Sequence, residues 1–152
     1  MEPYALEIIA PADLSLFYKI REVVTKMPEV DLGTRSDRKV RGIGNGKVYV
    51  SCHMLTRALA VCFPVKVKDG HFHGLWEHSW LVTENERTII DPYPVAVVGG
   101  PILLDVSCLS PWVKEGVYEE GVLSSLNKDP NFPSYVVKVT EVVCKTAKRL
   151  GY

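Results

Sequence analysis

The sequence has no long apolar run, no excess of either charge and no closely spaced pair of cysteines. Eighteen lysines and arginines balance eighteen acidic residues in 152, so the net charge does not favour nucleic acid or an anionic membrane as a partner. No stretch approaches the apolar length of a membrane span. The N-terminal MEPYALEIIAPADL also lacks the basic start of a signal peptide. These absences predict a protein without a membrane span and without a nucleic-acid partner.

The cysteines are few and widely spaced, which argues against a dense disulfide framework or a CxxC redox or zinc motif. We therefore expect reduced thiols in a cytoplasmic protein. A secreted protein with two disulfides is the alternative. The four residues concerned are Cys52, Cys62, Cys108 and Cys144.

Length and composition suit one globular domain over residues 1–152, with 47% hydrophobic and 24% charged residues. Apolar residues recur at helical spacing after Pro11, and this helix starts at Pro11 or is capped by Asp13. A polar, glycine-containing loop should follow over 28–46. Ser51 is the expected N-cap of a second helix, and a third is expected over 134–150. The predicted helical stripes are Leu14, Phe17, Ile20, Val24 and Met27, then Met54, Leu55, Ala58, Leu59 and Cys62, then Val136, Val139, Val143, Ala147 and Leu150.

Short strands are expected between the second and third helices. VKVK reads as a strand that ends in a turn at Asp69 and Gly70, while LWEHSWLVT and RTIIDPY read as two further strands. The order of helix, helix, antiparallel sheet and helix predicts an α+β fold.

The segment HSWLVTENERTIIDPYP places a histidine and an aspartate on these last two strands. If the hairpin is centred between Glu84 and Asn85, His78 and Asp91 stand directly opposite each other on one face. The carboxylate can then hold the imidazole in one tautomer and stabilise its protonated form. A slip of one residue in the register would separate them.

Cys52 is the candidate nucleophile because it follows the expected N-cap Ser51. Unpaired backbone N–H groups and the helix dipole favour a thiolate at this position. The other three cysteines have apolar neighbours in the sequence and read as buried side chains. Cys52, His78 and Asp91 together predict nucleophilic acyl chemistry of the Cys-His-Asp type.

A cysteine at a helix start, then HSW, then IIDPYP resembles the transglutaminase-like superfamily of cysteine enzymes over residues 48–94. The resemblance implies a papain-like α+β core in which N-terminal helices pack on a small antiparallel sheet. It implies that Cys52 is the nucleophile, His78 the general base and then acid, and Asp91 the residue that orients the histidine. It also implies a peptide or protein amide substrate and thiol chemistry without a metal or other cofactor.

The sequence departs from the papain pattern because it contains no glutamine, the residue that often supplies one donor of the oxyanion hole. That hole should have a second donor besides a backbone N–H. The oxyanion candidates are the Cys52 backbone N–H and the side chains of Tyr49, Asn45 and Trp76. The candidates for a substrate groove are Trp76, Trp80 and Tyr93.

Three other interpretations compete with the thiol enzyme. His71 and His73, with His78 or Cys52, can form a zinc site in a metal-dependent hydrolase, although no HExxH motif is present. RGIGNGKV is rich in glycine but departs from the phosphate-binding pattern, so we read it as a loop. A binding module with the same fold and no catalysis is the remaining alternative. We favour a cysteine peptidase or amidase that acts through an acyl-enzyme on Cys52.

Overall fold

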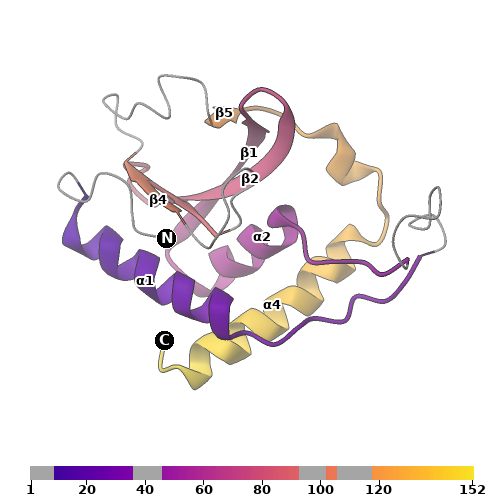
Figure 1. Ribbon diagram of the computed structural model, residues 1–152, viewed down its shortest axis with the longest axis horizontal. Coiled ribbons are helices and arrows are strands. Elements are labelled where there is room, and N and C mark those ends of the chain that lie inside the picture. Colours follow the sequence, from indigo (N-terminus) through magenta and orange to yellow (C-terminus); the bar gives the residue numbers. More distant parts are fainter. Residues whose placement is uncertain (1–8, 36–45, 93–101, 106–117) are drawn as a thin grey trace.

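The computed structural model describes residues 9–35, 46–92, 102–105 and 118–152, and it has the predicted α+β order. Its helices and strands are, in chain order, α1 (Pro11–Lys26), α2 (Cys52–Cys62), β1 (Val65–Phe72), β2 (Trp76–Thr83), β3 (Thr88–Asp91), β4 (Ile102–Asp105), β5 (Tyr118–Glu120), the 3-10 helix η4 (Ser124–Asn127) and α4 (Phe132–Arg149). Figure 1 shows α2 between the sheet and α4. The helix that begins with Cys52 therefore packs against the sheet on one side and against α4 on the other.

Helix α1 begins at Pro11, which occupies the first helical position, where a missing N–H costs nothing. Asp13 is not the N-cap, since Ala10 takes that position without a side-chain hydrogen bond. The Asp13 carboxylate instead accepts a hydrogen bond of 2.7 Å from the Thr88 hydroxyl in β3. Phe17, Ile20 and Val23 form the buried face of this helix. Asp13 therefore connects α1 to β3 and does not cap the helix, a choice that the sequence left open.

Helix α2 begins as predicted, with the Ser51 hydroxyl accepting a hydrogen bond from the Met54 backbone N–H. Ala58 and Leu59 are completely buried in the core that α2 shares with α1, α4 and the sheet. The C-terminal helix α4 contributes Val139 and Val143, which are also completely buried. A rigid, well-packed helix therefore presents Cys52 at its first residue.

The expectation of four reduced cysteines is wrong for two of them. Cys62 at the end of α2 and Cys144 in α4 form a disulfide with a Cα–Cα distance of 5.8 Å. The two helices pack against each other along this line, so their side chains meet although 82 residues separate them. Cys52 is a free cysteine, and Cys108 lies outside the described residues. The two cysteines meet because their helices pack together. The spacing of the cysteines along the chain does not reveal this packing.

The sheet is antiparallel, with the strand order β4-β3-β2-β1-β5. The turn predicted at Asp69 and Gly70 is wrong, because β1 continues through both residues to Phe72. The chain turns at His73 and Gly74, both of which have positive φ. Gly70 is needed for close approach rather than for a turn, since a Cβ there would lie 1.9 Å from a backbone oxygen of β5.

The hairpin between β2 and β3 has a register two residues away from the predicted one. Leu81 pairs with Ile90 and Val82 with Ile89. If this register is continued by one residue along each strand, Asp91 lies across from Trp80. The shift arises in the turn, where Glu86 has a positive φ of 59° and the Asn85 side chain accepts a hydrogen bond from the Arg87 N–H. Because the shift is an even number of residues, the side chains predicted to share a face still share it.

In the described residues, none of the helices has both the length and the apolar character needed to cross a membrane.

Candidate active site

Cys52 lies at the first turn of α2, at the edge of the buried core. The residue is 8% exposed and is therefore buried. The N-terminus of the helix supplies unpaired N–H groups and partial positive charge close to it. This position favours the thiolate.

His78 and Asp91 meet as predicted, although they are diagonal rather than directly opposite neighbours. The Nε2 atom of His78 lies 2.7 Å from Oδ2 of Asp91, and both side chains are completely buried. Diagonal neighbours on adjacent strands are within reach of side chains of this length. The carboxylate therefore holds Nε2 as a donor and leaves Nδ1 as the nitrogen that can exchange a proton.

Tyr118 completes this group, and the sequence analysis did not identify it. Its hydroxyl donates a hydrogen bond of 2.7 Å to the same Oδ2 atom of Asp91. Burial, followed by the neighbouring Asp91 charge, raises the pKa of Tyr118, so the hydroxyl keeps its proton and remains a donor. Tyr118 belongs to β5, which β1 and β2 separate from β3. No local pattern links residues 118 and 91, and only the sheet order brings them together.

The His78 ring lies in an aromatic cluster on the face of the sheet opposite to Ser79 and Leu81. The Trp80 ring stacks on it at a centroid distance of 6.1 Å, and Phe72 meets it edge-on at 5.8 Å. Tyr118 packs against Phe72 and Trp80 at 5.2 and 5.1 Å. These rings exclude water from the His78–Asp91 contact and restrict rotation of the imidazole.

The Cys52 thiol is the group whose ionisation the site changes most directly. Burial raises its pKa, but the nearby His53 and His78 rings outweigh burial and lower the pKa from 9.0 to about 6. At neutral pH the thiolate is therefore the main form. Two histidines contribute to this effect, whereas the sequence analysis assigned only His78.

His78 changes in the opposite direction. Burial lowers its pKa, but the hydrogen bond to Asp91, contact with Cys52 and the charges of both raise it from 6.5 to about 9. In the described residues the Nδ1 atom of His78 has no formed hydrogen bond, yet the ring is close enough to the thiol for each to shift the other's pKa. Between pH 6 and 9 the pair is a thiolate and an imidazolium, and the two values belong to the pair.

A second polar group connects α2 to the sheet next to this pair. The Nδ1 atom of His53 lies 2.6 Å from the Ser79 hydroxyl, which donates a hydrogen bond to Asp69. Arg57 makes a two-point ion pair with Asp69, at 2.7 and 3.1 Å, and donates to the His53 carbonyl at 3.1 Å. The i,i+4 spacing of His53 and Arg57 on a helix indicates that they share a face. Their partners on the sheet could be identified only from the structure.

The oxyanion candidates differ in where they lie. The Cys52 backbone N–H is at the helix start, where it has no carbonyl partner within the helix. The Tyr49 side chain is 64% exposed and lies under the Lys47 ammonium group, and Trp76 is 48% exposed at the start of β2. Asn45 lies outside the described residues. The backbone N–H is thus the donor that the geometry places at the site.

The candidates for the substrate groove also differ in where they lie. Trp80 is 3% exposed and supports the His78 ring, Trp76 is half-exposed, and Tyr93 lies outside the described residues. A cavity of about 450 Å³ lies beside the start of α2 and the end of β3. Its walls include Val30, Val50, Leu55 and Pro92. These are mainly apolar side chains, and Val50 and Pro92 are close in sequence to Cys52 and Asp91.

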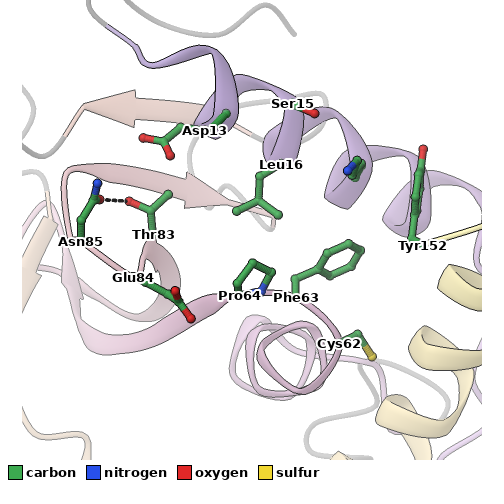
Figure 2. A pocket seen from close by; sticks show the side chains of 12 residues that line it. Asp13, Ser15, Leu16, Cys62, Phe63, Pro64, Thr83, Glu84, Asn85 and Tyr152 are labelled. Carbon is green, nitrogen blue, oxygen red and sulfur yellow. Dashed lines mark hydrogen bonds between the residues drawn. The ribbon is translucent and has the colours of Figure 1, made fainter.

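Another cavity, of about 630 Å³, is at the other end of α2 (Figure 2). It lies between α1 and the β2–β3 turn, with Leu16, Phe63 and Thr83 in its walls. Cys62 also lines it, and an eleven-residue helix is about 16 Å long. This cavity is therefore remote from the Cys52 thiol and takes no part in the chemistry considered for it.

No group of three or more histidine, cysteine, aspartate or glutamate side chains within residues 9–35, 46–92, 102–105 and 118–152 is arranged to hold a metal ion. His71 and His73, the candidate ligands, belong to the end of β1 and the turn after it.

Comparison of the chain with protein-family models, with curated proteins and with solved structures found no match in any of the three.

Proposed function

We propose that the protein is a cysteine enzyme that cleaves or transfers an acyl group at an amide bond, through an acyl-enzyme on Cys52. The proposal depends on one observation above all. A thiol at a helix N-terminus and a buried histidine that is fixed at Nε2 by Asp91 shift each other's pKa. This is the arrangement of nucleophile, base and orienting residue that covalent acyl chemistry requires.

The first half of the reaction uses the ion pair. The Cys52 thiolate attacks the carbonyl carbon of the substrate, and the carbonyl oxygen becomes an oxyanion. The Cys52 backbone N–H and the positive end of α2 stabilise this charge. His78 then gives its Nδ1 proton to the departing amine, and the carbonyl reforms as a thioester on Cys52.

The second half returns the enzyme to its starting state. His78, now neutral, accepts a proton from water or an amine as this acceptor attacks the thioester. The Cys52 thiolate leaves, and the imidazolium is restored beside it. Asp91 and Tyr118 hold the ring in place throughout, because the Nε2 contact is needed in both protonation states.

The cavity beside α2, whose walls are mostly apolar but include the Glu29–Lys47 ion pair, suits an uncharged side chain of the substrate. An acyl group on Cys52 would have this cavity next to it, since Val50 precedes the helix and Pro92 follows the catalytic carboxylate. We therefore favour a peptide or protein amide with an apolar residue near the cleaved bond.

A papain-like core belongs to the same proposal. A cytoplasmic location does not, because the expectation of reduced thiols failed at Cys62 and Cys144.

The test is capture of the acyl-enzyme. Wild-type protein and variants are incubated with activated acyl esters and a peptide amide library that varies the apolar residue, and intact mass and product release are followed. Wild type should gain one acyl group on Cys52 that hydroxylamine removes. Cys52→Ala should gain none, and His78→Gln should be slowed at least about a hundredfold, the usual contribution of acid–base catalysis.

The exposed residue His73, in the turn after β1, provides a matched histidine control. His73→Asn suits its positive φ and should acylate at the wild-type rate. Equal acyl transfer by wild type and Cys52→Ala would refute the proposal. A folded wild-type protein that is never acylated would favour a binding module instead.

A further inference from the structure

Arg57, on the second turn of α2, places its guanidinium group where four elements meet. The Nη1 atom donates to the His53 carbonyl in α2 at 3.1 Å, and Nη1 and Nη2 bind the two carboxylate oxygens of Asp69 in β1 at 3.1 and 2.7 Å. Nη1 is also 3.4 Å from the Ser79 hydroxyl in β2. The guanidinium lies over the Phe132 ring of α4, 5.6 Å from its centroid. The proposed mechanism uses none of these groups.

The groups around this guanidinium belong to the chain neighbours of the two reacting residues. His53 follows Cys52, and Ser79 follows His78. These two neighbours also contact each other, since His53 Nδ1 lies 2.6 Å from the Ser79 hydroxyl. Asp69 is the residue of β1 that pairs with Ser79 in the register of the sheet, and it accepts a hydrogen bond from the Ser79 hydroxyl. A movement of α2 that took Cys52 away from His78 would therefore break this set of contacts.

Directional contacts of this kind set a position more closely than apolar packing does. Hydrophobic contact is non-directional, whereas a two-point contact between a guanidinium and a carboxylate fixes orientation as well as distance. Burial raises the pKa of Asp69, but hydrogen bonds from Arg57 and Ser79 outweigh it and lower the pKa below its usual range. Asp69 is therefore ionised and accepts all of these hydrogen bonds. Precision matters here because a displacement of about 1 Å can lower a reaction rate a hundredfold.

We propose that Arg57 is a positioning residue for the reaction. It fastens the first turn of α2 to β1 and β2, and it thereby keeps the Cys52 sulfur aligned with the His78 ring. The inference rests on the proposed function, and it adds to that site a residue that acts through its neighbours rather than on the substrate. A partly exposed ion pair contributes little to stability, so the loss of Arg57 should affect the rate far more than the stability.

The chain offers a matched ion pair as a control. Arg35, after α1, lies 2.7 Å from Asp129, before α4, and these side chains are 27% and 20% exposed. The side chains of Arg57 and Asp69 are similarly exposed, at 25% and 30%. Neither Arg35 nor Asp129 is adjacent in the sequence to a residue of the proposed chemistry. The same substitution in both pairs therefore separates the loss of an ion pair from the loss of alignment.

The first test compares Arg57→Lys with Arg35→Lys. Lysine keeps the positive charge, but its single ammonium group cannot make the planar two-point contact. For hydrolysis of a p-nitrophenyl acyl ester, Arg57→Lys should lower kcat between about tenfold and a hundredfold and leave KM unchanged. Arg35→Lys should keep the wild-type kcat. Urea denaturation should show similar losses of stability in the two variants, so that a difference in kcat does not come from unfolding.

The second test measures the pH midpoint of iodoacetamide labelling at Cys52 in Asp69→Asn, read by peptide mass spectrometry. Removal of a nearby negative charge by itself favours the thiolate and would lower the midpoint. Lost alignment with His78 has the opposite effect. We expect the midpoint to rise by about one pH unit, a tenfold loss of thiolate on the rising part of the profile. This variant also tests the inference if Arg57→Lys fails to fold.

The outcomes separate this inference from the proposed function. A folded Arg57→Lys protein with the wild-type kcat, or a midpoint in Asp69→Asn that does not rise, would overturn the positioning role and leave the acyl-enzyme proposal intact. An equal loss of kcat in Arg57→Lys and Arg35→Lys would overturn it too, because the effect would then be one of general stability. A Cys52→Ala protein that hydrolyses the ester as fast as wild type would instead refute the proposed function, and the positioning role would fall with it.

Discussion

Replacement of Cys52 by serine should change how the stability of the protein depends on pH. The substitution keeps the size of the side chain but removes a group that ionises near neutral pH. When the wild-type protein folds near neutral pH, one proton moves from Cys52 to His78. The variant lacks the thiol, so its free energy of unfolding should depend on pH in a different and predictable way.

The sign follows from the two pKa shifts. His78 has a folded pKa of about 9, above its ordinary 6.5, so the stability it contributes is present below 6.5 and is lost as the pH rises through 9. Cys52 has a folded pKa of about 6, below its ordinary 9.0, so its contribution is present above 9.0 and is lost as the pH falls through 6.

These two trends cancel in the wild-type protein between pH 6.5 and 9. The folded pair then holds one proton, on His78, and the unfolded chain also holds one, on Cys52. Equal proton numbers mean that the pair adds no slope to the free energy of unfolding. In Cys52→Ser only the trend of His78 remains, with a slope of up to about 1.4 kcal/mol per pH unit. Over this interval the variant should lose at most about 3.4 kcal/mol relative to wild type, and less because Cys52 no longer helps to raise the His78 pKa.

The measurement is urea denaturation of both proteins at several pH values from 6.5 to 9, without reducing agent so that the Cys62–Cys144 disulfide remains. Only the difference between the two curves is interpreted, since all other titrating groups are common to both. A difference that stays constant across this range would refute the thiolate–imidazolium pair. A constant difference is also what a Cys52 that stays protonated in the folded state would give, because it would then hold one proton in both states.

Two further predictions concern the supports of the site. Tyr118→Phe removes one hydrogen bond to a buried carboxylate and should lower the free energy of unfolding by about 1.5–3 kcal/mol, measured by urea denaturation; a neutral result would mean that water replaces the hydroxyl. Reduction of the Cys62–Cys144 disulfide frees a loop of 82 residues and should destabilise the protein by about 4.5 kcal/mol on chain-entropy grounds. Calorimetry with and without reductant measures this effect, and unchanged melting after confirmed reduction would contradict it.

The local elements were predictable because neighbouring residues decide them. The apolar spacing that includes Phe17 and Ile20 predicted α1, and the Ser51 hydroxyl predicted the start of α2. The alternation around His78 predicted β2. Cys52, His78 and Asp91 could be identified as candidates for the same reason, since a helix start and two adjacent strands are recognisable from short segments.

Contacts between distant segments were not predictable from such patterns. The register of β2 and β3 was wrong by two residues because the geometry of the Asn85–Glu86 turn set it. Gly70 was predicted to be part of a turn, yet a glycine is needed there because β5 approaches the β1 backbone closely.

The sequence by itself determined the residues that carry the proposed chemistry, because helix starts and strand periodicity are local properties. Only the tertiary structure decided what surrounds them. Tyr118 reaches Asp91 because of the strand order, Ser79 meets His53 because α2 packs on the sheet, and Cys62 meets Cys144 because two helices lie side by side. Each of these contacts depends on the way separate elements pack, and that packing is a property of the whole chain.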